Sequence, residues 1–365
     1  MKTKPIPDAA ITHKPMMALT QVAVSARLFF LTVSESPEVM NAGWLMIIFG
    51  AILALPSAII AYWLMKKYGS PVENGIRRTF GKTGLKCMLV LSLILFTLET
   101  VSLIKILSDT AAYSVYYRIQ TWMLILITAV CVIYASLKGG NGIGGAAQIW
   151  RRIFPFLILP AVILQKDSIH LRYLTPVFGP GVSIILKNAV HAAVYFSMIP
   201  LSFIIETGYS VQSAGSTNEA KPCSILSRYT LCMITVICLV ILHSSVFPAL
   251  PLSGKGNSDY TDIMISNGRI YRSAQLPILI MWFASAFLSC AYMLYSAGRM
   301  LGKLFESENG TYVLIPGGIA VMLAFIGHNG YIKGVSVCLA AAICVLWLLM
   351  PVFGFIITRI RRKKV

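Results

Sequence analysis

Charged residues are scarce in this sequence: only 12% of its 365 residues are Asp, Glu, Lys or Arg, whereas 57% are hydrophobic. Acidic residues are the scarcest, with 13 Asp and Glu against 31 Lys and Arg. The mean hydropathy of +0.76 lies far above that of an ordinary soluble domain. This composition excludes a soluble globular protein and indicates a membrane protein.

Motifs for catalysis, metal binding and cofactor binding are also lacking. The eight cysteines show no C-x-x-C spacing, and neither H-E-x-x-H nor G-x-S-x-G occurs. The segment "GGNGIGG" (139–145) contains a formal G-x-G-x-x-G, but it follows an apolar span and no βαβ unit surrounds it. It is interpreted as a flexible hinge. We therefore expect no enzyme activity, no metal site and no cofactor.

Apolar stretches long enough to cross a bilayer recur along the whole chain. A membrane core about 30 Å thick needs about 20 mostly apolar residues per helix. On this basis the sequence predicts an all-α integral membrane protein with ten transmembrane helices, in one polytopic domain covering residues 1–365. The predicted spans are 12–33, 41–65, 84–107, 119–137, 146–165, 181–206, 225–248, 274–298, 311–328 and 335–358.

The basic residues predict the orientation of these spans. With the N-terminus in the cytoplasm, 20 Lys and Arg fall on the inner side, Arg151 and Arg152 among them, and 7 fall on the outer side. Because cytoplasmic loops of membrane proteins are enriched in basic residues, both termini are expected to be cytoplasmic. The net charge of +18 follows from the same distribution, because basic cytoplasmic loops are favoured next to the anionic lipids of the inner leaflet of the lipid bilayer. We therefore expect no nucleic acid partner.

Ten spans with both ends inside suit a five-plus-five inverted repeat, with repeat one at about 12–165 and repeat two at about 181–358. In such a repeat, helices 1 and 6 are interrupted near mid-membrane and expose backbone groups to a small substrate. In helix 6, Pro200 removes a backbone donor, and Ser197 and Ser202 could satisfy freed carbonyl groups or a ligand. The alternative is a simple proline kink in a packed helix.

Two loops carry signals of their own. In the inner loop 66–84, Pro71 is a plausible helix start and Gly81 a plausible stop, with Val72, Ile76 and Phe80 on one face. This segment is expected to lie on the inner membrane surface. The outer segment 248–275 is expected to hold a short surface helix around residues 260–266.

Arg27 lies in the apolar run "VAVSARLFFLTV" (22–33), where an unpaired cation is costly. Glu99 of helix 3, together with Lys187 and His191 of helix 6, is predicted at a similar depth, which favours a polar vestibule open to the outside. There Arg27 either pairs with Glu99 or holds a ligand carboxylate while Glu99 meets the ligand ammonium. The alternative is that Arg27 extends to the outer interface.

The candidate ligand-binding residues come from helices 1, 3, 6 and 8. For Ser289 and Tyr292, ordinary helix packing is the alternative. The full set is Ser25, Ala26, Arg27, Glu99, His191, Tyr195, Ser197, Pro200, Ser289 and Tyr292.

Three stretches resemble the B subunits of the nutrient germinant receptors of endospore-forming bacteria, which are permease-like proteins of the amino acid–polyamine–organocation superfamily. "KKYGSPVENGIRRTFGKTG" (66–84) is similar to the first inner loop of that family. "GGAAQIWRRIFPF" (144–156) is similar to its glycine-rich loop before helix 5. "LRYLTPVFGPGV" (171–182) is similar to the segment before helix 6 and is the most specific of the three.

The resemblance implies a LeuT-like fold with a pocket between helices 1, 3, 6 and 8 for an amino acid or similar small nutrient. It also implies location in the spore inner membrane and two partners, an A-type membrane subunit and a C-type lipoprotein. Family members often carry a glycine-containing turn in helix 1 and some carry a glutamate in helix 6. This chain instead has 26–28 "ARL" and 199–200 "IP" there, so the ligand class is not carried over.

The function expected from the sequence is that of a permease-like germinant receptor subunit, which binds a nutrient and signals to its partners. An amino acid or amine transporter in the bacterial cytoplasmic membrane is one alternative. A scaffold subunit with a degenerate pocket is the other.

Overall fold

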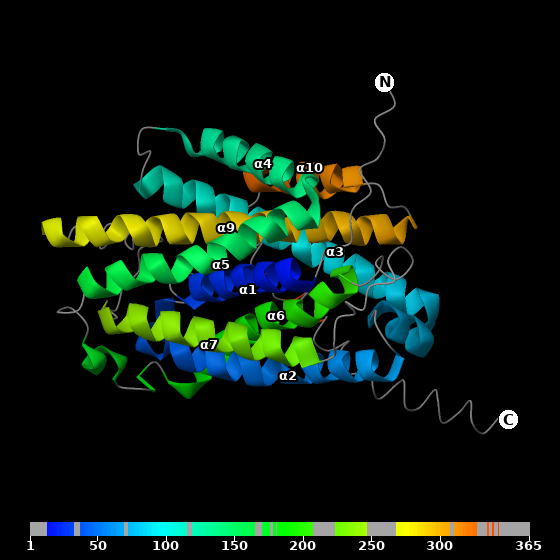
Figure 1. The fold of residues 1–365 in the computed structure, drawn as a ribbon, viewed down its shortest axis with the longest axis horizontal. Helices are drawn as coiled ribbons and strands as arrows, with labels where there is room; N and C mark the ends of the chain where they lie inside the picture. The colour runs from blue at the N-terminus through cyan, green and yellow to red at the C-terminus, as the bar shows by residue number, and fades with distance from the viewer. Residues whose placement is uncertain are drawn as a thin grey trace.

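The computed structural model shows a bundle of long helices that run roughly along one direction (Figure 1). It describes residues 13–32, 37–68, 72–114, 119–164, 170–175, 178–179, 181–206, 223–246, 268–306 and 310–326, with a few positions between 334 and 342. Every element within these residues is helical, as the composition predicts.

Each described long helix overlaps one predicted span. The helices are α1 (His13–Phe30), α2 (Gly43–Tyr68), α3 (Val72–Ser114), α4 (Thr121–Leu137), α5 (Gly139–Leu164), α6 (Val182–Glu206), α7 (Cys223–Val246), α9 (Gly268–Leu304) and α10 (Leu314–Ile326). Short 3-10 turns occur at η2 (Pro37–Ala42), η4 (Leu171–Leu174) and η5 (Gly310–Val313). The predicted span 335–358 and the predicted surface helix around 260–266 lie outside the described residues.

Five of the described helices contain a stretch that is long and apolar enough to cross a membrane. These helices are α2, α3, α6, α7 and α9. The pair α4 and α5, bent by 108° at the break between them, passes the same test together. α1 and α10 coincide with predicted spans but are not among these. The structure thus supports an integral membrane protein with five to six apolar spans in the part of the chain that it describes.

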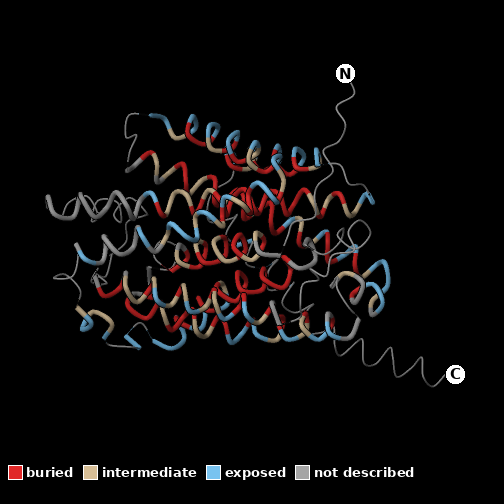
Figure 2. Tube along the Cα trace, viewed as in Figure 1, coloured by how far each residue is buried: buried red, intermediate tan, exposed pale blue. Residues whose placement is uncertain are grey.

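The core of the bundle surrounds α1. α1 contacts α5 and α9 on one side and α6 and α7 on the other, and α2 packs along α6 while α3 packs along α9. Buried residues concentrate on α1, α6 and α9, whereas exposed residues line the outward faces of the outer helices (Figure 2). Many exposed side chains there are large and apolar, such as Ile52 and Val130, as expected of faces turned toward lipid.

The predicted helix start and stop for residues 72–81 are confirmed, whereas the position of this segment on the inner membrane surface stays a prediction. α3 begins at Val72, directly after Pro71, and Ile76 is fully buried. Gly81 has φ 74 and ψ −175, which breaks the helical geometry at the predicted stop. Because a residue with a side chain rarely adopts a positive φ, glycine allows the amphipathic first segment to turn into the membrane-spanning part of α3.

Three expectations about helix interruptions are wrong within the described residues. α1 is helical throughout residues 13–30, and α6 runs unbroken over residues 182–206 with Pro200 inside it. The segment 140–145 is part of α5, and the turn between α4 and α5 falls at Lys138 and Gly139. Local propensity predicted a loop there, but the glycines allow close packing of α5, since a Cβ on Gly144 would lie 2.7 Å from Pro15 Cβ of α1.

Candidate functional site

The centre of the candidate site is an ion pair between α1 and α3. Arg27 Nε donates a hydrogen bond to Glu99 Oε2 at 3.0 Å, and both side chains are almost fully buried, 2% and 1% exposed. Two charges enclosed by apolar helices are stable only when each is close to an opposite charge or a hydrogen-bond partner. The pair satisfies this requirement for both groups at once.

A second layer of polar contacts surrounds the pair. Arg27 Nη2 donates to Ser102 Oγ at 3.2 Å, and the Tyr195 hydroxyl donates a long bond to Glu99 Oε1 at 3.4 Å. The Arg27 guanidinium also lies over the Tyr195 ring, with Cζ 4.8 Å from the ring centroid. A cation over an aromatic face is attracted by the electron density of the ring, so Tyr195 contacts both charges of the pair.

Helix α9 closes the site from another side. The Ser289 hydroxyl donates to the carbonyl of Ala23 on α1 at 3.2 Å and to the carbonyl of Ser285 at 2.7 Å. The Tyr292 ring meets the Phe96 ring of α3 edge to face, with centroids 6.4 Å apart. The structure thus brings together residues of α1, α3, α6 and α9, the four helices that the sequence assigned to the pocket as helices 1, 3, 6 and 8.

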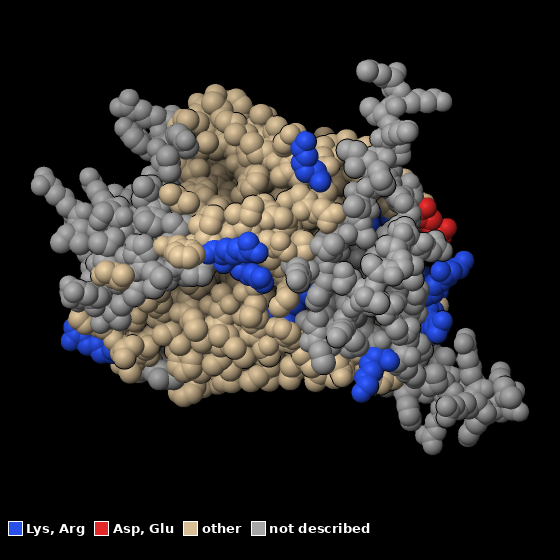
Figure 3. Space-filling model, viewed as in Figure 1, with Lys and Arg blue, Asp and Glu red and all other residues tan. Residues whose placement is uncertain are grey.

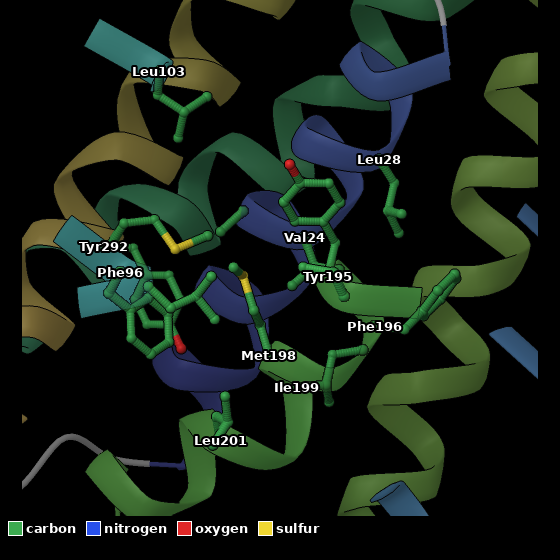
Figure 4. Close-up of a cluster of buried hydrophobic side chains, with 14 of the residues drawn as sticks. Val24, Leu28, Phe96, Leu103, Tyr195, Phe196, Met198, Ile199, Leu201 and Tyr292 are labelled. Carbon is green, nitrogen blue, oxygen red and sulfur yellow. The ribbon is translucent and has the colours of Figure 1, made fainter. Parts of the chain in front are cut away.

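Apolar side chains fill the space beside the ion pair. In Figure 4, Tyr195 and Met198 extend from α6 toward α1, Ile199 lies on the side of α6 that also carries Phe196, and the rings of Phe96 and Tyr292 lie next to each other. All of these side chains are buried, and Phe96, Met198, Ile199 and Tyr292 are fully inaccessible. The site is therefore a mixed one, with one paired set of charges set against an apolar and aromatic wall.

The remaining candidates lie on the same helices but in different surroundings. Ser25 is buried but lies two residues before Arg27 and so on another side of α1, toward Cys232 of α7, whereas Ala26 is half-buried. His191 is half-buried on α6, one turn before Tyr195. Lys187, which the sequence placed with this cluster, is exposed and so does not belong to the buried network.

The polar residues around Pro200 contact their own helix. The hydroxyls of Ser197 and Ser202 donate to the carbonyls of Val194 and Ile199, both at 2.6 Å. Pro200 itself is buried. This arrangement agrees with the alternative interpretation of helix 6, a proline inside a packed helix. Both serine hydroxyls donate to backbone carbonyls of α6 itself, about one turn earlier.

The burial of Arg27 decides between the alternatives for this residue. Extension to the lipid interface is excluded, because the guanidinium points to Glu99 and is 2% exposed. An open polar vestibule is also wrong for this structure, since Glu99 and Ser289 are fully buried and Tyr195 is nearly so. The hydrophobic pattern predicted the depth of these residues, but it could not predict that the surrounding helices close over them.

Sequence reasoning missed several residues that contact the site. Ser102 lies one turn after Glu99, on the same face of a helix, and that spacing could have identified it. Phe96 lies one turn before Glu99 by the same rule.

The chemistry available at the site is recognition of charge. A fixed cation and a fixed anion 3.0 Å apart can bind complementary groups of a small polar molecule beside an apolar wall. Within the described residues no group of three or more His, Cys, Asp or Glu side chains lies close enough together to hold a metal ion.

Solved structures with the same fold include membrane transporters. MhsT in complex with L-phenylalanine has a TM-score of 0.69 at 14% identity, covering 91% of this chain and 88% of that chain. Mhp1, a nucleobase–cation symport-1 family transporter in a closed conformation with bromovinylhydantoin bound, has a TM-score of 0.65 at 14% identity, covering 94% and 80%. A mutant of the manganese transporter of Eremococcus coleocola has a TM-score of 0.60 at 14% identity, covering 97% and 81%. At these identities the likeness concerns the fold, which is the LeuT-like fold expected from the sequence.

Comparison with curated proteins finds no match. The sequence profile of a protein family described as "Spore germination protein", the spore permeases, matches residues 12–330. This match covers nearly the whole chain and includes every helix that forms the site. The chain therefore belongs to the spore germination protein family of permease-like membrane proteins.

Proposed function

We propose that the chain is the permease-like subunit of a spore nutrient germinant receptor and that it binds an amino acid or similar zwitterionic nutrient between α1, α3, α6 and α9. The observation that carries the proposal is the buried Arg27–Glu99 pair beside an apolar wall. In the bound state the ligand carboxylate contacts Arg27 and the ligand ammonium contacts Glu99. The apolar wall receives the ligand side chain.

Charge balance favours a zwitterion over a singly charged ligand. A ligand that separates Arg27 from Glu99 must supply a new partner for each, because a lone buried charge is strongly unfavourable. A zwitterion supplies both partners and leaves the net charge of the site unchanged. A simple amine or a simple carboxylic acid would leave one of the two protein charges without a partner.

The closed site links binding to a change in helix arrangement. Because Arg27 and Glu99 are sealed from the surface, a ligand reaches them only when helices around α1 move apart. Binding therefore stabilises an arrangement different from the closed one, as in any two-state protein whose ligand prefers one state. An A-type membrane subunit and a C-type lipoprotein in the spore inner membrane would receive this change as the signal.

A transporter function is the second candidate, and the likeness of the fold to a manganese transporter and to a nucleobase–cation symport-1 family transporter favours it. In that case the same opening would alternate between the two sides of the membrane and release the ligand inside. The two candidates differ in one measurable quantity, the accumulation of ligand across a membrane.

The test combines germination, uptake and binding. Spores that lack this gene, and spores that carry R27A or E99Q, are exposed to a panel of single amino acids, and uptake of the same amino acids is measured in growing cells. Lys187→Ala, on the exposed face of α6, is the matched control. Loss of response to one amino acid in both pocket variants, with normal uptake and a normal K187A control, is the expected result.

Other outcomes separate the alternatives. Loss of uptake with normal germination would assign transport instead. Unchanged germination and uptake in both pocket variants would overturn ligand binding at this pair and leave a scaffold role. Binding of the active amino acid to the purified protein, measured by calorimetry, checks that the effect arises in this chain.

A further inference from the structure

Two adjacent arginines lie halfway along α5, a position where a membrane helix rarely carries charge. Arg151 and Arg152 are the two central residues of the helix, equally far from Gly139 at one end and Leu164 at the other. At about 1.5 Å per residue, each arginine is about 18 Å from the nearer end of the helix. The sequence prediction assigned both to the inner side, because it assumed that the preceding glycines form a loop.

Contacts with neighbouring helices confirm this depth. The Trp150 indole N–H donates to Ser285 Oγ of α9 at 2.8 Å. Ser285 lies midway between Arg272 and Arg299, so it occupies the middle of the apolar stretch between two basic positions of α9. The residue next to Arg151 is therefore bonded to the mid-membrane part of the bundle.

Arg152 faces outward from the bundle. Both arginines are exposed, but only Arg152 shares a face of α5 with the exposed apolar side chains Ile149 at 61%, Ile153 at 41% and Phe156 at 73%, because Arg151 lies about 100° further back around the helix. In Figure 3, which has the same view as Figure 1, basic side chains stand over α5 within a surface of uncharged residues. In the described part of the chain neither arginine makes an ion pair or a hydrogen bond through its side chain.

Lipid alone does not satisfy these two groups. An arginine reaches the lipid headgroups when it lies near a helix end, but the middle of a core about 30 Å thick is too far from either interface. A cation at that depth needs an anionic partner inside the membrane or a water-filled cavity. Among the described residues no acidic side chain meets this need for Arg151 or Arg152.

A second copy of this chain is a poor match for that face. Among the described acidic side chains inside the spans, Glu99 is buried against Arg27 and Asp109 lies near the end of the α3 span. The described surface offers no exposed carboxylate at mid-membrane depth. Charge complementarity thus points to a different polypeptide.

We propose that the outward face of α5 around Arg151 and Arg152 is a docking surface for a transmembrane helix of another protein, which places an Asp or Glu side chain at mid-membrane depth. The Arg152 guanidinium pairs with that carboxylate, Arg151 adds positive charge at the edge of the surface, and the exposed side chains of Ile149, Ile153 and Phe156 pack against the apolar remainder of the helix. This surface is distinct from the ligand site, so the proposal stands independently of which ligand the pocket binds.

The test uses the full chain in its native spore membrane. A photo-activated benzophenone amino acid replaces Phe156, and the same probe at Ile52 on α2 is the matched control, since Ile52 is 58% exposed on another face. After irradiation, we expect the Phe156 probe to yield one discrete adduct with a different membrane protein. Mass spectrometry should place the linked peptide in a transmembrane helix that contains Asp or Glu.

Charge variants then test the pairing itself. In R151E/R152E the adduct should fall at least tenfold, and in R151K/R152K, which keeps the charge and checks folding, it should remain. Replacing the identified carboxylate of the partner by Lys should restore the adduct in R151E/R152E. Ligand binding by the purified R151E/R152E protein should be unchanged, which separates this proposal from the proposed function.

Several results would overturn the proposal. These are adducts with lipid only, an adduct with a second copy of this chain, or an adduct of equal yield from the Ile52 probe. Equal yield in R151E/R152E would also exclude an electrostatic contact. Labelling of R152C by a membrane-impermeant maleimide, as fast as that of R78C in the inner segment, would show that α5 faces water and needs no partner.

Discussion

Replacing one member of the Arg27–Glu99 pair should destabilise the protein far more than replacing both. R27M leaves the Glu99 carboxylate buried with only the long bond from the Tyr195 hydroxyl, and E99L leaves the Arg27 guanidinium with Ser102 and the Tyr195 ring. Breaking a buried ion pair by removing one partner costs about 3–5 kcal/mol, because the remaining charge stays uncompensated. We expect each single variant to fall in that range.

The double variant R27M/E99L removes both charges and substitutes apolar side chains of similar size. Such replacements are often neutral or stabilising, so its cost should be below about 1 kcal/mol. The coupling energy, which is the cost of the double variant minus the costs of the two single variants, is then at least about 5 kcal/mol in magnitude. This exceeds the roughly 0.5–3 kcal/mol usual for contacting residues, because each single variant leaves a lone buried charge. Y195F keeps the ring under the guanidinium and loses only the 3.4 Å bond, so it should cost at most about 1 kcal/mol.

The assay is equilibrium unfolding of the purified protein in mixed micelles, monitored by tryptophan fluorescence, for the wild type, both singles and the double variant. The reasoning would be refuted by single variants that each cost less than about 1 kcal/mol, or by additive effects in the double variant. Additive effects would mean that the two charges are solvated independently, for example by water that enters between α1 and α3. Nutrient response of R27M/E99L spores should nevertheless be lost, since stability and recognition depend on different properties of the pair.

Two further predictions concern helix packing and the inner surface. A Cβ on Gly50 would lie 2.5 Å from an alanine Cβ of α6, so Gly50→Ala should cost about 1–3 kcal/mol in the same unfolding assay, whereas Gly318→Ala, with nothing within 4 Å, should be close to neutral. Lys303 Nζ of α9 lies 2.7 Å from Glu73 Oε2 in the inner segment of α3, and Glu73→Gln should speed amide hydrogen exchange over residues 72–80 relative to the exposed-site control Arg77→Gln. Equal exchange in both variants would mean that the apolar contacts of the segment hold it without the ion pair.

The inner segment and the span positions were predictable because they depend on local properties. A run of apolar residues, a preceding proline and a glycine with positive φ act within a few residues of chain, and the segment 72–81 formed where these signals placed it. The segment 139–145 was mispredicted for the complementary reason. Its glycines disfavour a helix in isolation, but Gly144 allows α5 to pack tightly against Pro15 of α1, and this tertiary contact outweighs local propensity.

The site shows the same division. The sequence indicated that Arg27 and Glu99 lie at similar depths on two helices, since depth follows from counting residues along each helix. It could not indicate that the two side chains face each other, that Tyr195 covers both, or that Phe96 and Tyr292 close the wall, because the rotation and spacing of helices depend on packing across the bundle.

The sequence by itself determined the class of this protein, the approximate limits of its described apolar helices and its family, because all three depend on composition and on patterns along the chain. Only the tertiary structure decided which charges are hidden and which are turned outward. Arg27 and Arg152 both lie within apolar helices, yet one is sealed against a carboxylate of the bundle and the other is exposed on the outward face of its helix. The difference arises because the rotation of each helix in the bundle decides which of its faces points inward. That rotation is set by packing contacts between residues that are far apart in the sequence.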